Sequence, residues 1–271
     1  MKKILTFGLL TITIRLIGQP IYGDNNEAGQ FTTINGVRIY YETYGMGDPL
    51  VIVHGHRSSI SGMKNQIEYF SKKYKVLIAD TRAHGKTEVG DKKLSYELMA
   101  EDIKLLMDKM EIDSAMVVGY SDGGVIGLIM AMKYPVKVKK LVTISACIKP
   151  DTTAVSKRAV ESIKNQIVKA NEMIAKNDTT NNWTMEKIFG ELLLYNPNYD
   201  FKDLNKIMCP TLIMQADRDV IKQEHSFQIY RSIKKANLSI MPGLNHSLVT
   251  RDPVFVNTTI DRFISNPFRV R

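Results

Sequence analysis

Cysteine is scarce in this chain of 271 residues, which contains only Cys147 and Cys209. Two cysteines cannot build the dense disulfide framework of a small secreted domain. Both lie at the edges of predicted strands, where an unpaired cysteine behaves as a small apolar residue. We therefore expect both to be free and buried, although an exported protein could bridge them.

Signatures of membrane spans, metals and nucleotides are also missing. Beyond the N-terminus no apolar run reaches membrane-spanning length, so no membrane span is expected in the mature chain. The five histidines lack metal-ligand spacing and there is no dinucleotide fingerprint, so neither a metal nor an organic cofactor is implied. The net charge is +9, but the lysines are scattered singly and form no basic run with aromatics. Nucleic acid is therefore not an expected partner.

The first thirty residues differ from the rest of the chain. Three residues, MKK, give a short positive start, an apolar run covers residues 4–14, and a polar stretch follows to about residue 30. This resembles a bacterial secretory signal peptide, with cleavage expected between Gly23 and Ala28. Arg15 interrupts the apolar run, and no Ala-x-Ala site is present. We expect export to the periplasm or the medium, with an uncleaved anchor or a cytoplasmic protein as alternatives.

Strands alternate with helices along most of the chain. Asn35-Gly36 predicts a β-hairpin over 31–44. Short apolar runs predict strands, and 3.6-residue periodicity predicts helices. The predicted strands are 50–53, 76–79, 115–118, 138–146, 211–214 and 237–240, and the predicted helices include 63–70, 94–110 and 254–264. This order predicts an α/β fold with a mostly parallel sheet, helices on both faces and the antiparallel hairpin at one edge.

The alternation stops between residues 150 and 204, which carry no strand signal. Apolar residues at 155, 159, 163, 167 and 174 form one helical stripe, and a second helical piece covers about 185–194. With 44% apolar residues the chain can form one large core plus a small insertion. We therefore expect a flexible N-terminus at 1–30, an α/β core at 31–149 and 205–271, and a helical cap inserted at 150–204.

A strand, a turn and a helix meet at Gly119-Tyr120-Ser121-Asp122-Gly123. This context turns a bare G-x-S-x-G match into a predicted nucleophile elbow. Glycines on both sides let strand and helix pass without a Cβ clash, and the serine takes a strained backbone. The helix then directs its first amides at the reacting atoms. The alternative is a glycine-rich turn with an incidental serine.

A serine nucleophile needs a base and a group that holds the base. His246 lies just beyond the last predicted strand, where such groups gather in a parallel sheet. The acid is Asp219 or Asp217, which both follow the preceding strand. We favour Asp219 because it lies further out on the loop, whereas Asp217 suits bracing of the turn. Its role would be to fix the imidazole tautomer and stabilise the charged form.

Taken together, these motifs resemble the α/β-hydrolase family over residues 31–267. The order Ser…Asp…His, the elbow, a His-Gly loop at 54–55 and the motif Asp80-x-Arg82-x-x-Gly85 are similar to esterase, lactonase and perhydrolase members. The resemblance implies that the acid lies three residues after Ala216, which gives Asp219. It also implies that the backbone amides of His56 and Asp122 form the oxyanion hole.

The chain departs from the family pattern in two loops. Ser58 stands in the His-Gly loop where a glycine is common, and residues 220–222 lack the usual proline. Neither departure touches the predicted triad, although both leave the loop geometry open. A serine at position 121 also argues against related enzymes that use an aspartate nucleophile.

The elbow and the short predicted cap are further similar to valacyclovir-hydrolase-like esterases. That resemblance implies that Asp122 could receive the ammonium group of an α-amino acid ester. We favour the alternative, that Asp122 is a carboxylate stabilised in the first turn of a helix. Trp183, Phe189 and Tyr195 are candidates to line the pocket under the cap, or to pack within the cap itself.

The sequence therefore predicts a serine hydrolase that cleaves a carboxylic ester or lactone of a small molecule through an acyl-enzyme. Ser121 would be the nucleophile, His246 the base and Asp219 the acid. A cofactor-free perhydrolase or haloperoxidase-like enzyme and a carbon–carbon bond hydrolase use the same triad and remain alternatives. A non-catalytic member that binds a small molecule is the alternative from another class.

Overall fold

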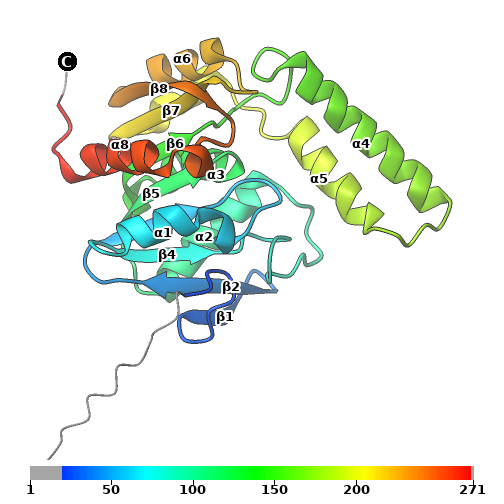
Figure 1. Ribbon diagram of the computed structural model, residues 1–271, viewed down its shortest axis with the longest axis horizontal. Helices are drawn as coiled ribbons and strands as arrows, with labels where there is room; N and C mark the ends of the chain where they lie inside the picture. Colours follow the sequence, from blue (N-terminus) through cyan, green and yellow to red (C-terminus); the bar gives the residue numbers. More distant parts are fainter. Residues whose placement is uncertain (1–19, 270–271) are drawn as a thin grey trace, which may run out of the picture.

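The computed structural model describes residues 20–269, and its centre is one eight-stranded sheet (Figure 1). The apolar run of the predicted signal peptide lies outside the described residues. The strand order across the sheet is β1-β2-β4-β3-β5-β6-β7-β8. The strands are β1 (Gly29–Ile34), β2 (Val37–Tyr44), β3 (Pro49–Val53), β4 (Lys75–Ala79), β5 (Ala115–Tyr120), β6 (Val138–Ile144), β7 (Thr211–Arg218) and β8 (Ala236–Asn245).

Strand directions agree with the predicted topology. Strands β3 to β8 pair in parallel, whereas β1 pairs with β2, and β2 with β4, in antiparallel fashion. The β1–β2 turn has φ of 48° at Asn35 and 80° at Gly36. Positive φ at both central residues gives the turn the twist that a tight hairpin needs, and asparagine and glycine tolerate it. The hairpin at one edge is thus confirmed.

Helices cover both faces of the sheet. One face packs on α1 (Lys64–Phe70), α7 (Leu248–Arg251) and α8 (Pro253–Ser265), and α1 and α8 lie in front in Figure 1. The other face packs on α2 (Tyr96–Lys109), α3 (Asp122–Lys133) and α6 (Gln223–Ser232). Each face has its own buried apolar cluster. Short 3₁₀ turns lie at Ile60–Met63, Pro135–Lys137 and Phe201–Lys206. The predicted α/β fold class is confirmed.

Two helices between β6 and β7 stand apart from the sheet. These are α4 (Lys157–Ala175) and α5 (Trp183–Tyr195). They lie side by side at the right of Figure 1, on the side toward which the β4 arrow points. Only Val160 and Ala170 of α4 are buried. Gly190 of α5 faces Ile167 of α4 so closely that a Cβ there would lie 2.6 Å from the isoleucine side chain. The two helices therefore pack mainly on each other.

Some details differ from the sequence prediction. Strand β8 is longer than expected, because it continues past Pro242 and pairs Asn245 with Arg218 across an irregularity in β7. Cys147 and Cys209 are free, as expected, but only half-buried. Among residues 20–269, no helix has both the length and the apolarity to cross a bilayer.

Candidate active site

Ser121 occupies a sharp turn between β5 and α3. Its φ of 53° and ψ of −117° lie outside the usual regions for a non-glycine residue, so the turn is strained. A Cβ on Gly119 would lie 2.0 Å from the carbonyl oxygen of Gly123. A Cβ on Gly123 would lie 2.1 Å from the carbonyl oxygen of Val53. Strand and helix therefore touch through bare backbone, which explains why the sequence has glycine at both positions.

A chain of hydrogen bonds links Ser121 to a buried acid. The Ser121 Oγ lies 3.0 Å from His246 Nε2, and His246 Nδ1 lies 2.7 Å from Asp219 Oδ1. A carboxylate can only accept, so the imidazole carries its proton on Nδ1 and Nε2 accepts from the serine. Asp217 does not take part in this chain, and its Oδ1 is buried without a partner within the described residues. The structure thus brings Ser121 and His246 together with Asp219, the favoured acid, and not with Asp217.

Asp219 accepts hydrogen bonds from two further groups besides His246. The Ser145 Oγ donates to its Oδ2 at 2.5 Å, and the amide of Ile221 donates to its Oδ1 at 3.1 Å. Burial raises the pKa of Asp219, but the hydrogen bond and charge of His246 and the bond from Ser145 lower it more. The pKa therefore lies below its usual value, and the carboxyl stays ionised. Ser145 was not among the predicted site residues, although its place directly after β6 was an available signal.

Tyr120 fixes the loop that carries the histidine. Its hydroxyl donates to the backbone carbonyl of His246 at 2.7 Å, and the two rings lie 5.5 Å apart. Burial, together with the charges of Asp219 and Asp122, raises the pKa of Tyr120 to about 12, so it remains a donor. The residue before Ser121 thus ties β5 to the loop after β8. This contact joins positions more than a hundred residues apart, and no local pattern indicated it.

Two backbone amides lie beside Ser121 without an acceptor. Within residues 20–269, neither the amide of His56 nor that of Asp122 donates a hydrogen bond to the protein. His54 fixes the peptide that carries the first of them, since its Nδ1 donates to the carbonyl of Gly55 at 2.8 Å. The amide of Thr81 donates to His54 Nε2 at 3.0 Å. Burial lowers the pKa of His54 to about 4, which keeps this tautomer neutral.

The Asp80-x-Arg82-x-x-Gly85 motif forms a scaffold beneath these loops. Asp80 accepts from the amides of Ile60 and Lys86, each at 2.8 Å. Arg82 is buried and pairs with Asp102 of α2 through bonds of 2.7 and 3.0 Å. A Cβ on Gly85 would lie 2.1 Å from Asp80, so the loop closes tightly over the carboxylate. The motif contributes structure, not reacting groups.

A cavity of about 290 Å³ opens onto Ser121 and His246. Most of its lining is apolar and comes from α3, α4, α5 and the loops after β6 and β7. Its lining residues include Tyr96, Val125, Cys147, Pro150, Val155, Ala159, Val160, Ile163, Leu193, Val220 and Ile221. The cavity therefore suits a small, largely apolar group next to the serine.

Asp122 contributes the acidic group in this wall. Its carboxylate lies 3.1 Å from His56 Nδ1 and is also hydrogen-bonded to Tyr96. Burial raises the pKa of Asp122, but the hydrogen bond and charge of His56 and the bond from Tyr96 lower it more. The side chain is thus an ionised, partnered carboxylate in the wall of the cavity. It also lies in the first turn of α3, as expected.

The three aromatic candidates do not line this cavity. The indole of Trp183, the first residue of α5, donates to Asp178 in the segment between α4 and α5, and Tyr195 is 63% exposed. Phe189 packs edge-on against the imidazole ring of His56 at 5.3 Å and lies tilted against that of His84 at 4.8 Å. The face of α5 that meets the cavity carries Leu193 instead.

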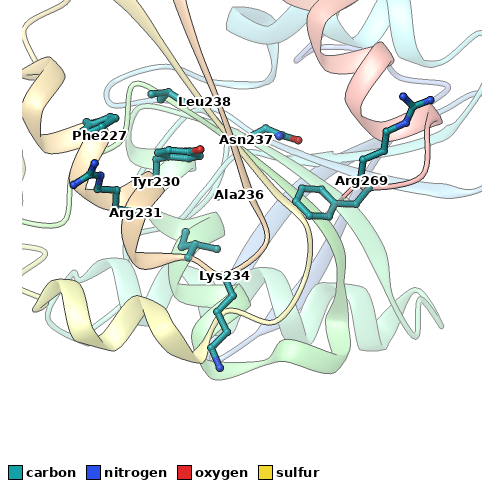
Figure 2. A pocket seen from close by; sticks show the side chains of 10 residues that line it. Phe227, Tyr230, Arg231, Lys234, Ala236, Asn237, Leu238 and Arg269 are labelled. Atoms are coloured by element: carbon teal, nitrogen blue, oxygen red, sulfur yellow. The ribbon is translucent and has the colours of Figure 1, made fainter. Parts of the chain in front are cut away.

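A larger cavity, of about 670 Å³, lies at the far edge of the sheet (Figure 2). It is lined by α6, β8 and the C-terminal segment, and includes Phe227, Lys234 and Arg269. Among the described residues, its lining contains no serine, cysteine, histidine or carboxylate side chain. In the described part of the chain, no group of histidine, cysteine or acidic side chains is arranged to hold a metal ion.

Comparisons with known proteins agree with the fold. The sequence model of the α/β hydrolase fold matches residues 48–186. The chain is 25% identical to the serine hydrolase BPHL of Mus musculus over 255 residues, which are 85% of this chain and 84% of that protein. It is 31% identical to a non-heme chloroperoxidase of Streptomyces lividans over 122 residues, 44% of each chain. The enol-lactonase of Burkholderia xenovorans has a similar fold, with a TM-score of 0.74 and 18% identity over 88% of this chain and 100% of that one.

Proposed function

Because the chain belongs to the α/β-hydrolase fold family, we propose that it is a serine hydrolase that cleaves a carboxylic ester or lactone of a small molecule. The observation that carries the proposal is the hydrogen-bond chain from Ser121 through His246 to Asp219. It supports a reaction through an acyl-enzyme, since a serine needs a base within hydrogen-bond reach to become a nucleophile.

Ser121 attacks the substrate carbonyl while His246 Nε2 accepts its proton. The bond to the leaving alcohol then breaks, and His246 returns the proton to the alcohol oxygen. Water next attacks the acyl-enzyme, with His246 again taking a proton, and Ser121 is released with the carboxylic acid. Asp219 stays ionised throughout, so that it orients the imidazole and stabilises its charged form.

The amides of His56 and Asp122 receive the developing oxyanion. Their lack of protein acceptors within residues 20–269 supports this role. Backbone amides held by a sheet and a helix need little reorganisation as charge develops. His54 contributes indirectly, because its bond to the Gly55 carbonyl orients the peptide that ends in the His56 amide.

Apolar acyl groups suit the cavity of about 290 Å³. Its wall on α4 and α5 supports a role for residues 150–204 as a cap over the site. Asp122 could also accept an ammonium group, which would extend the substrates to α-amino acid esters. We further propose export to the periplasm or the medium, on the signal-like pattern of the first thirty residues.

Perhydrolysis is the second candidate, favoured by the partial match to a non-heme chloroperoxidase. Hydrogen peroxide would then replace water as the attacking group on the acyl-enzyme, so that the acyl group leaves as a peracid and Ser121 regains its proton from His246. The nucleophile, base and oxyanion amides would be unchanged. This candidate would be favoured if, at the same ester concentration, the enzyme forms peracid in the presence of hydrogen peroxide faster than it hydrolyses the ester in its absence.

The test compares wild type with Ser121→Ala on aryl esters of increasing acyl length, a lactone and an aminoacyl ester. Wild type is expected to hydrolyse at least one class, and the variant to lose about three to six orders of magnitude in kcat. Ser265→Ala, which changes a serine on α8 far from the cavity, is the matched control and should keep full activity. Equal activity of wild type and Ser121→Ala would refute the proposal.

A further inference from the structure

The residues that carry the two unpartnered amides also bond to each other through their side chains. His56 follows β3, and Asp122 begins α3. The His56 Nδ1 lies 3.1 Å from the Asp122 Oδ2, and the two side chains are only 17% and 8% exposed. The fold does not require this side-chain bond, because the backbone alone carries the two amides, on two different loops.

The two segments already approach each other closely at Gly55 and at Gly123. A Cβ on Gly55 would lie 3.1 Å from the Cβ of Ser121, and one on Gly123 would lie 2.1 Å from the carbonyl of Val53. The side-chain bond between His56 and Asp122 adds a second link between the two loops. The residues that carry the two amides are thus joined by a side-chain bond as well as by close backbone approach nearby.

The surroundings leave the His56 ring one hydrogen-bond partner. Its Nε2 is buried and has no partner among the described residues. The ring packs edge-on against Phe189 of α5 and lies 6.2 Å from His84. The bond to Asp122 therefore decides the orientation of the imidazole. Asp122 has in addition the hydroxyl of Tyr96, which anchors it to α2.

We propose that the His56–Asp122 side-chain bond positions the two oxyanion amides at a fixed separation. This inference rests on the proposed serine hydrolase function. Oxyanion stabilisation depends on donors that are set before the reaction, because movement during the reaction costs part of their effect. The loop after His56 is held further along by the Ser58 amide on the Gly55 carbonyl and by the Ile60 amide on Asp80, whereas His56 itself is tied to the elbow by its side chain. Arg57, the next residue, takes a strained φ of 50°. Both residues act as positioning residues through their side chains.

The experiment is a double-mutant cycle on a neutral aryl ester. Asp122→Ala and His56→Ala should each lower kcat by about tenfold to a hundredfold, with KM changed by less than about threefold. The double variant should be no slower than the slower single variant, because either change removes the same bond. Asp122→Asn keeps an acceptor oxygen and should retain most of the activity. Asp261→Ala, which breaks a pair with Lys73 on the outer helices, is the control.

Two results would overturn the proposal. Additive losses in the double variant would mean that the two side chains act separately. An Asp122→Ala variant with normal kcat on neutral esters, but a raised KM for aminoacyl esters, would make Asp122 an ammonium site instead.

Failure of the proposed function would look different. In that case wild type would be inert on every ester and Ser121 would resist fluorophosphonates. Wild type, Asp122→Ala, His56→Ala and the double variant would then be unfolded in urea. Non-additive shifts of the midpoint would support the bond as a restraint between the loops, and additive shifts would overturn it.

Discussion

The two walls of the cavity are built in opposite ways. On the sheet side, ten of the twelve residues of α3 are buried, and backbone meets backbone at Gly119 and Gly123. On the other side, two of the nineteen residues of α4 are buried. Reacting groups need geometry fixed to fractions of an ångström, and dense packing provides it. A wall that only shapes the substrate can be packed lightly, so we expect changes there to alter selectivity more than stability.

Among changes that keep Ser121, the largest effect is expected at the buried acid. Asp219→Asn nearly keeps the shape but removes the charge and replaces one of two carboxylate oxygens, which both accept hydrogen bonds, by an NH₂ donor. The His246 tautomer is then no longer fixed, so kcat/KM should fall by about 10³ to 10⁴. Asp217→Asn, two residues away and outside the hydrogen-bond chain, should change it by less than threefold. Ester kinetics on both variants decide between the acids, and an equal loss in both would contradict the assignment.

Gly123→Ala should be the most damaging small change to the fold. The added Cβ would lie 2.1 Å from the carbonyl of Val53, and neither α3 nor β3 can move without disturbing the sheet. We expect a loss of about 3 kcal/mol or more in the free energy of unfolding, measured in urea. Ala159→Gly in α4 is the contrast and should cost about 1 kcal/mol. Similar losses in both variants would remove the distinction between the two walls.

Lowering the pH should reduce the stability of the sheet side, because three of its buried histidines must become protonated. Burial lowers the pKa of His54, His84 and His225 to about 4. The unfolded chain takes up these protons near pH 6.5, whereas the folded chain does not until about pH 4. Stability should therefore fall as the pH drops from 6.5 to 4, by up to about 3 kcal/mol for each histidine.

Urea midpoints between pH 7 and pH 4.5 measure this loss. His225→Gln should reduce the slope by about a third, since it removes one of the three protons. Helices α4 and α5 contain no histidine, so the pH dependence belongs to the sheet side. A midpoint that does not change with pH would contradict the neutral, buried state of these residues.

Filling the lightly packed wall should change selectivity. Ala159 is half-buried and lines the cavity, so Ala159→Phe takes up part of its 290 Å³. We expect kcat/KM for the longer acyl chains to fall about tenfold relative to acetyl esters, with little change in the urea midpoint. Ala175→Phe, exposed at the far end of α4, is the matched control. A parallel loss for all chain lengths would indicate a general disturbance of the site.

The smallest effect is expected where the two walls meet. Arg57 pairs with Glu186 of α5 at 2.5 Å, but the arginine side chain is 40% exposed. Solvent screens such a pair, so Glu186→Gln should cost less than about 1 kcal/mol in stability. A loss of several kcal/mol would mean that the helix pair is essential to the fold of the sheet side.

Local signals explain what could be predicted from the sequence. The Asn35-Gly36 turn, the alternation of strands and helices and the elbow glycines each act over a few residues, and the structure agrees with them. Residues at the ends of parallel strands meet at one edge, which is why His246 and Asp219 were found. The contact of Ser145 with Asp219 depends on how two loops fold toward each other, and the spacing of residues in the sequence does not predict that contact.

The helix pair shows the limit of periodicity. The stripe from residue 155 to 174 indicated an apolar face on α4, and Ala159 and Ile163 of that stripe line the cavity. The stripe gave no information on how the pair is turned relative to the sheet. Trp183, Phe189 and Tyr195 were therefore chosen by residue type, and the rotation of α5 brings Leu193 to the cavity instead.

The most direct test of the account is covalent labelling with a fluorophosphonate, followed by peptide mass mapping. Wild type should carry one adduct, on Ser121, and Ser121→Ala should carry none. His246→Ala should react at least a hundredfold more slowly, because the serine loses its base. A folded wild type that stays unlabelled at Ser121, or that labels as fast without His246, would contradict the claim that this serine is an activated nucleophile.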